Sequence, residues 1–159
     1  MVMFVGEVCG KAEEAINSWV SLFPASKVET IQRYGKGELP DQEGTVRYAE
    51  FSLLGQQFRS MDSAYEHAFS FNEAISFIVH CDTQEEIDRY WEALSAVPEA
   101  EACGWLKDKY GLSWQIVPTS MDEMMSSGSK EQIARVTEAF LKMKKFDIET
   151  LERAYQGSV

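Results

Sequence analysis

The residues of this chain that could act as nucleophiles or metal ligands are few and widely spaced. There are two histidines, and the three cysteines stand at Cys9, Cys81 and Cys103. No CxxC or HxxxH spacing offers a zinc site, and an odd number of distant thiols does not suggest a disulfide framework. His80 and Cys81 are adjacent, but neighbours in a strand point to opposite faces. We therefore interpret the thiols and His80 as structural or solvent-facing groups.

The chain is strongly acidic, because 26 Asp and Glu stand against 15 Lys and Arg, which gives a formal net charge of −11. Phosphate backbones and anionic lipid surfaces need clustered Lys and Arg, so we expect neither nucleic acid nor membrane as a partner. Hydrophobic residues make up 45% of the chain, enough for a buried core. Neither a signal segment nor an apolar run of membrane-spanning length is evident, so we expect a cytoplasmic protein.

Hydrophobic periodicity predicts two similar series of elements. The first has strands at 1–5, 27–34, 45–54 and 56–62 and an amphipathic helix at 10–23, which Pro24 ends. The second has a strand at 74–81, a helix at 83–97 and a hairpin at 103–107 and 112–117. Thr83 and Glu86 have the spacing of a capping box at the start of the second helix. We interpret Lys107, Asp108 and Lys109 as a solvated turn, and His67 as solvated in the linker.

The two series match at a constant offset of 72 residues, which predicts an internal repeat. The matched pairs are Glu13 and Glu85, Glu14 and Glu86, Trp19 and Trp91, and Leu22 and Leu94. We interpret the two tryptophans as equivalent core anchors. The repeat divides residues 1–118 into modules at about 1–63 and 72–118, and leaves 119–159 as a helical extension. In that extension, Ser120 with Glu123 and Ser129 with Gln132 have capping-box spacing.

Two long segments carry a resemblance to a known family. These are EAISFIVHCDTQEEIDRYWEAL at 73–94 and CGWLKDKYGLSWQIVP at 103–118. They are similar to the PhnB-like branch, often labelled 3-demethylubiquinone-9 3-methyltransferase, of the vicinal oxygen chelate superfamily of glyoxalases, bleomycin-resistance proteins and dihydroxybiphenyl dioxygenases. The resemblance extends over nearly the whole chain. It implies an α+β fold in which two repeated βαβββ modules form curved mixed sheets around a cavity, with C-terminal helices added, and it implies a homodimer.

The resemblance also indicates where metal-dependent members of the superfamily hold their ligands. Aligned through the helices and turn glycines, those positions here are Phe4, Arg59, Ser76 and Gln115. Phe4 has no donor atom, Ser76 is a weak neutral ligand, and Arg59 places a cation where the metal would lie. A transition-metal site needs at least three suitable donors, and only Gln115 is one. We therefore expect no divalent metal and predict no cofactor.

The same four positions, with Trp114, form our candidate ligand pocket. An inward-facing Arg59 would favour an anionic ligand such as a carboxylate or phosphonate, and an outward-facing one would be an ordinary surface arginine. Either Trp105 or Trp114 could line the cavity, where it would suit an apolar or aromatic ligand.

Two hypotheses for function follow. The first is a metal-free protein that binds a small molecule in a cup-shaped cavity. The second is an enzyme, either the methyltransferase of the family label or a metal-dependent lyase or dioxygenase. The sequence lacks the glycine-rich turn between strand and helix that common adenosylmethionine-dependent enzymes use, because Gly35, Gly37 and Gly44 lie in a hairpin loop. No catalytic residue is assigned.

Overall fold

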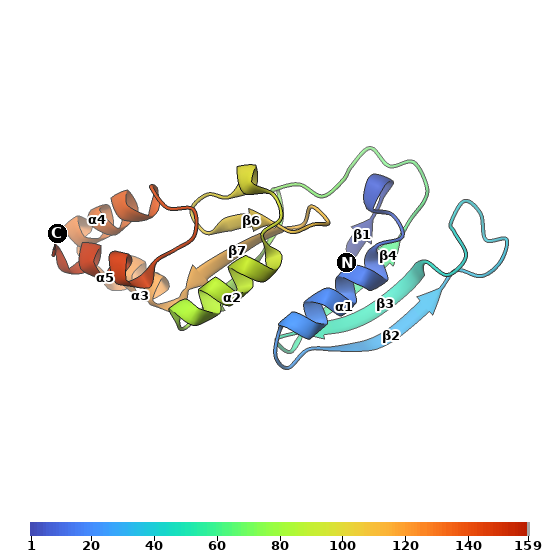
Figure 1. Cartoon of the computed structure of the whole chain (residues 1–159), viewed down its shortest axis with the longest axis horizontal. Helices are drawn as coiled ribbons and strands as arrows, with labels where there is room; N and C mark the ends of the chain where they lie inside the picture. The colour runs from blue at the N-terminus through green and yellow to red at the C-terminus, as the bar shows by residue number, and fades with distance from the viewer. Residues whose placement is uncertain (159) are drawn as a thin grey trace. The chain divides into compact units, whose positions relative to one another are not determined.

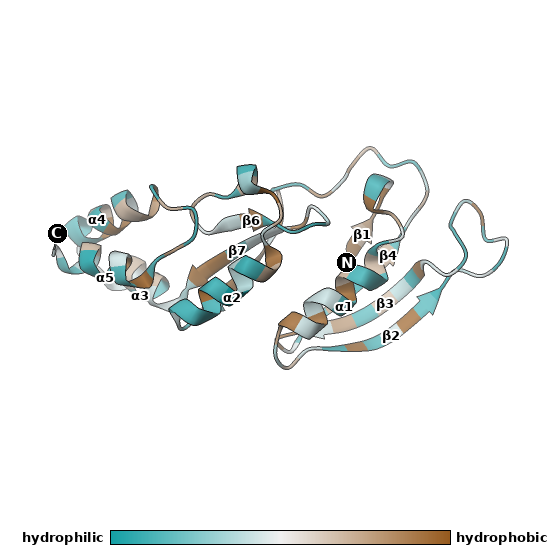
Figure 2. Ribbon diagram, viewed as in Figure 1, coloured by the Kyte–Doolittle hydropathy of each residue, from teal (hydrophilic) through white to brown (hydrophobic). Residues whose placement is uncertain are grey.

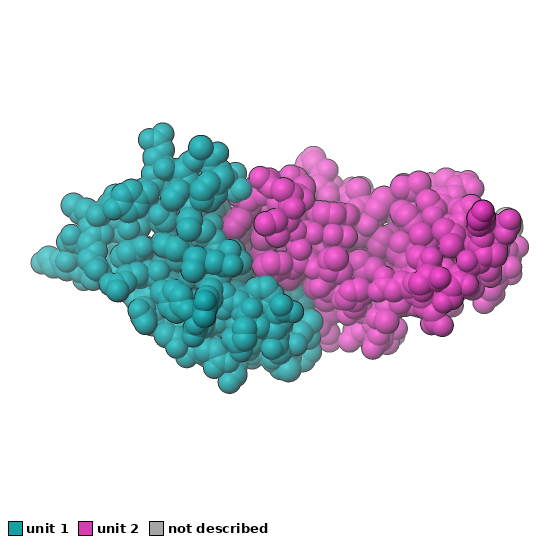
Figure 3. Space-filling view, turned by 180° about the vertical axis from the view of Figure 1, so that it is seen from behind, with its two compact units in different colours: residues 1–70 teal, residues 71–159 magenta. Residues whose placement is uncertain are grey.

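The computed structural model describes residues 1–158, which divide into two compact units (Figure 3). The first unit is Met1–Ser70, and the second begins at Phe71. Each unit builds its own sheet, with one helix across one face of that sheet (Figure 1). The α+β class predicted from the sequence is confirmed.

The first unit contains a four-stranded sheet in the order β1-β4-β3-β2. Its elements are β1 (Val2–Phe4), the 3₁₀ helix η1 (Gly6–Val8), α1 (Ala12–Leu22), β2 (Lys27–Arg33), β3 (Val46–Leu53) and β4 (Gln56–Asp62). β1 pairs with β4 in parallel, and the other neighbours are antiparallel. Two hydrophobic bands interrupt the otherwise hydrophilic β2 (Figure 2), and all residues of this strand are exposed or half-buried. The predicted βαβββ order of this half is confirmed.

The core of the first unit lies between α1 and the sheet. Trp19, on the buried side of α1, has its ring centroid 6.1 Å from that of Phe4 and 6.2 Å from that of Phe51. All three side chains are almost fully buried. The same side of the helix also buries Ala12, Ala15 and Ile16. The hydrophobic stripe predicted from the sequence is therefore the side of α1 that packs against the sheet.

The second unit contains a three-stranded sheet in the order β5-β7-β6. Its first elements are β5 (Ser76–Cys81), α2 (Gln84–Leu94), the 3₁₀ helix η2 (Pro98–Ala100), β6 (Trp105–Lys107) and β7 (Ser113–Pro118). β5 and β7 are parallel, and β6 is antiparallel to β7. Within the described residues, this half therefore has one strand fewer than the predicted repeat. Between α2 and β6 the chain forms η2 and a short bridge of Ala102 to Trp105 instead.

The buried stripes of α1 and α2 correct the predicted alignment of the repeat. The helices begin 72 positions apart, but their buried residues match at 71, as Ile16 with Ile87 and Trp19 with Tyr90. Trp91, which the sequence identities paired with Trp19, is only half-buried. The phase of the hydrophobic stripe decides which side chain enters the core, and identical residues one position out of phase point elsewhere.

Three helices follow the second sheet: α3 (Thr119–Ser127), α4 (Lys130–Phe140) and α5 (Ile148–Gln156). The predicted capping box at Ser129 is confirmed, since its hydroxyl accepts from the Gln132 N–H and the Gln132 side chain accepts from the Ser129 N–H. The one predicted at Ser120 is wrong, because α3 begins at Thr119 directly after Pro118. None of the helices among residues 1–158 combines the length and the apolarity needed to cross a membrane.

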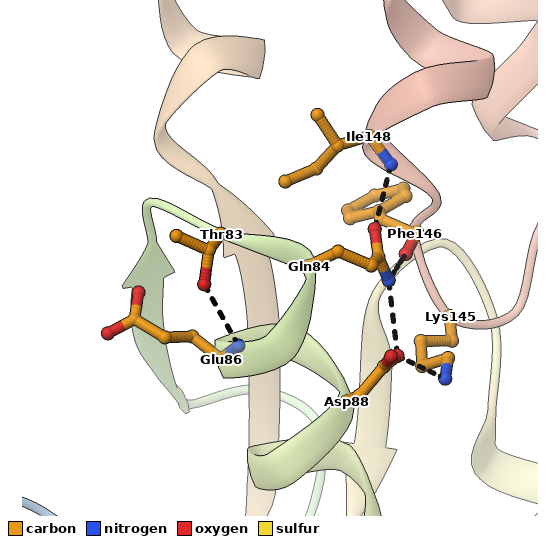
Figure 4. A network of polar contacts seen from close by, with 7 residues as sticks. All are labelled: Thr83, Gln84, Glu86, Asp88, Lys145, Phe146 and Ile148. Carbon is orange, nitrogen blue, oxygen red and sulfur yellow. Dashed lines mark hydrogen bonds and ion pairs between the residues drawn. The ribbon is translucent and has the colours of Figure 1, made fainter.

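The side chain of Gln84, in the first turn of α2, holds the segment that leads into α5 (Figure 4). Its Oε1 accepts from the Ile148 N–H at 2.9 Å, and its Nε2 donates to the Phe146 carbonyl at 3.1 Å. Lys145 forms an ion pair with Asp88, one turn further along α2. The Phe146 ring lies against the backbone at Gly104, where no side chain larger than hydrogen has room. Within the second unit, these contacts dock the helical extension on α2 and on the backbone at Gly104.

Candidate functional site

Ser76 and Gln115 meet on the second sheet. Gln115 Nε2 donates to Ser76 Oγ at 2.8 Å, from β7 to the neighbouring β5. Both side chains are half-buried. Strand registration places Ser76 opposite Ser113, and Gln115 lies two residues beyond Ser113, so all three side chains share one face. Ser113 Oγ is buried and has no hydrogen-bond partner among the described residues.

Two apolar side chains share this face. Trp105 on β6 is the registered partner of Gln115, and Ile78 on β5 is registered with Gln115 from the other side. Ile78 is 54% exposed, whereas the next residue, Val79, is 3% exposed on the opposite face. We refer to the face with Ser76, Ile78, Trp105 and Gln115 as the open face of the second sheet. It combines a polar pair with apolar surface on both sides.

Trp114 lies on the opposite face, which α2 covers. Its ring packs edge-on against Phe77, and the residue is 2% exposed. The indole N–H donates to Asp108 Oδ2 at 3.0 Å. The sequence left open which of the two tryptophans lines the cavity. The alternation of β7 directs Trp114 to the core, and the register of β6 with β7 directs Trp105 to the open face.

The burial of Asp108 shows that the predicted solvated turn at 107–109 is wrong at this residue. The residue is 3% exposed, and its Oδ1 accepts from the backbone N–H groups of Tyr110 and Leu112 at 2.9 and 3.0 Å. With the Trp114 indole on Oδ2, three N–H donors point at one carboxylate. A buried aspartate is stable in this position because hydrogen bonds replace its hydration.

In the first unit, Phe4 and Arg59 lie on opposite faces of the sheet. Phe4 is fully buried beside Trp19, on the side that α1 covers. Arg59 lies on the other side, with 62% of its side chain exposed, and its Nε donates to Glu50 Oε1 at 3.2 Å. The guanidinium of Arg59 thus already has a carboxylate partner, which weakens the case for Arg59 as the ligand's anion receptor.

Glu50 also accepts from the hydroxyl of Tyr48 at 2.5 Å. This hydrogen bond is the main cause that lowers the pKa of Glu50 and raises the pKa of Tyr48. Tyr48, Glu50 and Arg59 therefore form a small charged network on the uncovered face of the first sheet.

Asp62 is the fully buried carboxylate of the first unit and has a structural position. Its Oδ1 accepts from the N–H groups of Gly10 and Ala12, and its Oδ2 accepts from Val46 N–H, at 2.7 to 3.2 Å. Burial raises the pKa of Asp62, and the three N–H donors oppose that shift. The carboxylate joins the start of α1 to β3 and β4, which explains its burial without a catalytic role.

The thiols and histidines have structural surroundings as well. Burial raises the pKa of Cys81 to about 12, and burial followed by the charges of Asp62 and Asp41 raises the pKa of Cys9. His80 Nδ1 lies 3.2 Å from Asp122 on α3. His67 Nε2 is 2.9 Å from Ser63 Oγ, so this ring is held by a neighbour and is not simply solvated. Within residues 1–158, no group of three or more His, Cys, Asp or Glu side chains has an arrangement that could hold a metal ion.

Two mixed sheets, each crossed by one helix, define the glyoxalase-like architecture of the vicinal oxygen chelate superfamily. The chain belongs to the family described as 3-demethylubiquinone-9 3-methyltransferase, the PhnB-like branch, whose model matches residues 1–117. The helices α3, α4 and α5 lie beyond the matched residues.

Two solved structures illustrate the likeness. A PhnB protein from Bacillus cereus, which carries a provisional 3-demethylubiquinone-9 3-methyltransferase name, is 40% identical with a TM-score of 0.63, and the match covers 75% of this chain and 98% of that one. A protein of Pseudomonas aeruginosa is 16% identical with a TM-score of 0.56, over 73% of this chain and 93% of that one, which shows the fold alone. No curated protein matches the chain.

Proposed function

We propose that the open face of the second sheet binds a small, planar, uncharged molecule that carries hydroxyl or carbonyl oxygens, and that it does so without a metal ion. The observation that carries this proposal is the hydrogen bond from Gln115 to Ser76, with Trp105 and Ile78 beside it. An apolar surface around a few convergent polar groups is the composition of small-molecule sites.

The chemistry of the polar pair supports an uncharged ligand. Gln115 uses one amide hydrogen on Ser76, which leaves its carbonyl oxygen as an acceptor and its second hydrogen as a donor. The Ser76 hydroxyl can in turn donate its own hydrogen. An indole such as Trp105 offers an aromatic surface on which a planar ring can stack. Arg59, which is paired with Glu50, is not part of this proposed site.

The proposal is tested by calorimetric titration of the full chain with catechol, a planar probe with two hydroxyl groups. We expect saturable binding that falls about tenfold in Trp105→Ala and in Gln115→Ala, because each removes an interaction of roughly 1.4 kcal/mol. Gln57→Ala, an exposed glutamine on β4, is the matched control and should bind as the wild type does. Equal affinity in all four proteins would show that the ligand face is misplaced.

The family name supports a second candidate, methyl transfer to a phenolic oxygen. In that reaction the methyl group leaves the sulfonium of adenosylmethionine for the oxygen, the phenolic proton is released, and adenosylhomocysteine remains. Incubation with adenosylmethionine and catechol would then give guaiacol, which is heavier than catechol by one CH₂ unit and is detectable by mass spectrometry. The mixed sheets differ from the doubly wound parallel sheet of common adenosylmethionine-dependent enzymes, so we favour binding without turnover.

The absence of a metal, the assembly and the compartment are also proposals. Stoichiometric zinc, nickel, manganese or iron in protein purified without added metal would contradict a metal-free site. We propose a homodimer from the family resemblance, which sedimentation at micromolar concentration tests, since a sample that contains only monomer contradicts it. We propose a cytoplasmic location because the three cysteines are free thiols, as a reducing compartment maintains them.

A further inference from the structure

A cleft of about 380 Å³ lies between α4 and α5, in the helical extension beyond the residues that the family model matches. Residues of both helices and of the turn after α5 line it: Arg135, Glu138, Ala139, Lys142, Thr150, Arg153, Ala154, Gly157 and Ser158. The lining includes small side chains and a glycine, and it carries three cations against one carboxylate. In a chain with a net charge of −11, this is a local reversal of sign.

Arg135 is held in a fixed orientation at this cleft. Its Nε donates to the Ala154 carbonyl at 2.8 Å and its Nη2 to the Tyr155 carbonyl at 2.7 Å. Both acceptors are neutral, so these hydrogen bonds orient the guanidinium without cancelling its charge. Among the described residues, no carboxylate lies within ion-pair distance of Arg135. The remaining N–H donors of its planar fork are therefore available to an anion.

The other two cations of the cleft, Arg153 and Lys142, differ in how closely a carboxylate approaches them. Arg153 Nε is 3.9 Å from Glu149 Oε1, too far for a hydrogen bond, and both side chains are exposed. Lys142 donates to Glu138 at 2.8 Å, so those two charges cancel. The positive character of the cleft therefore comes from the two arginines, Arg135 and Arg153.

We propose that this cleft binds a small organic anion, whose acidic group pairs with the guanidiniums of Arg135 and Arg153 and whose apolar body lies against Ala139 and Ala154. Carboxylates and phosphate monoesters share the geometry that a guanidinium recognises, and both belong to this class. The volume lies within the usual range for small-molecule sites, about 300 to 1,000 Å³. The site is independent of the open face of the second sheet.

The test is titration of the full chain with benzoate, phenyl phosphate and the uncharged benzyl alcohol, followed by proton–nitrogen NMR spectra. We expect at least one of the two anions to give saturable shifts at the Ala154 and Gly157 amides, and which one does so distinguishes a carboxylate from a phosphate site. Benzyl alcohol should leave these resonances unchanged. Shifts with neither anion, or equal shifts with the alcohol, overturn the proposal.

Arg153→Gln isolates the role of charge, because the closest partner of the Arg153 side chain, Glu149 Oε1 at 3.9 Å, is too far for a hydrogen bond, and the substitution leaves the Arg153 backbone carbonyl, which accepts from the Ser158 N–H, in place. We expect its affinity for the anion to fall about tenfold, as the loss of a charge-assisted hydrogen bond predicts. Lys130→Gln, at the start of α4 and outside the cleft, changes the net charge equally and should keep the wild-type affinity. A second variant, Ala139→Leu, fills the cleft and should abolish binding while the rest of the spectrum is unchanged. If Arg153→Gln binds as tightly as Lys130→Gln, the anion does not use the cleft.

Discussion

The carboxylate of Asp108 accepts a hydrogen bond from the indole N–H of Trp114 at 3.0 Å, with both residues buried in the second unit. The same carboxylate accepts two backbone N–H groups of the turn, so it fixes the hairpin between β6 and β7. This hairpin carries Trp105 on β6 and its registered partner Gln115 on β7, and both side chains belong to the proposed ligand face. A buried aspartate on one face of the sheet thereby positions residues on the other.

Asp108→Asn tests this role. The amide has one acceptor oxygen where the carboxylate has two, so its NH₂ group must face either the indole or the backbone donors. We expect a loss of about 2 to 4 kcal/mol in the free energy of unfolding, measured by urea denaturation. Asp122→Asn makes the same change at an exposed position, and should alter stability by less than about 0.5 kcal/mol. Equal stability of the two variants would contradict the role assigned to Asp108.

Alanine substitutions at Gly104 and Gly111 separate the energetic cost of backbone strain from that of a steric clash. Both have positive φ, at +81° and +85°, so alanine is strained at either position. A Cβ at Gly104 would lie 2.5 Å from the Phe146 ring, whereas at Gly111 the nearest atom is 4.0 Å away. We expect Gly111→Ala to cost about 1 to 2 kcal/mol and Gly104→Ala about 1 to 3 kcal/mol more. Thermal unfolding of the two variants measures the difference, and no difference would mean that Phe146 does not dock there.

Gln84→Ala tests how the helical extension is held. The substitution removes the acceptor of the Ile148 N–H and the donor to the Phe146 carbonyl (Figure 4). We expect a loss of about 1 to 3 kcal/mol, concentrated in the contact between α5 and α2. Amide hydrogen exchange should therefore rise at 146–151 and stay unchanged in the first unit. Gln57→Ala serves again as the control. Equal amide exchange at 146–151 in both variants would show that Gln84 does not hold the helical extension.

Cys81 should be the protected thiol of the chain. Burial raises its pKa to about 12, so its thiolate, the reactive form, is scarce near neutral pH. We expect iodoacetamide at about pH 8 to label Cys9 and Cys103, which are half-buried, and to spare Cys81 until urea unfolds the protein. Peptide mass spectrometry after labelling measures this order. Labelling of native Cys81 as fast as Cys103 would contradict its burial.

The sequence predicted the elements of the fold well because most are strongly periodic. The stripe of α1 buries one side of that helix, and along β3 the buried Ala49 and Phe51 alternate with the half-buried Tyr48 and Glu50. The sequence alone does not reveal the role of Asp108, because a charged triplet in a turn resembles solvated surface, and only the folded hairpin brings the Trp114 indole to its carboxylate. Trp19 and Trp91 are the same residue type but are not equivalent in the structure. The position of a residue around the helix, and not its type, decides whether its side chain enters the core.

The candidate site was harder to predict than the fold. Ser76 and Gln115 were identified through the family resemblance, and the structure brings them into contact. Trp105 could not be separated from Trp114, because β6 is three residues long and its alternation is set only by its register with β7. Arg59 was open to two interpretations, and its exposed contact with Glu50 depends on which face of β4 the register assigns to it.

The central claim, that the open face of the second sheet is the ligand face, is tested most directly by the tryptophan indole resonances. Trp105 and Trp114 lie on opposite faces of one sheet, so each is a control for the other. During titration with catechol we predict saturable shifts of the Trp105 indole N–H and the Gln115 side-chain amide, with the Trp114 indole unmoved on Asp108. Shifts at Trp114 that equal those at Trp105, or no shift at either, would contradict the account.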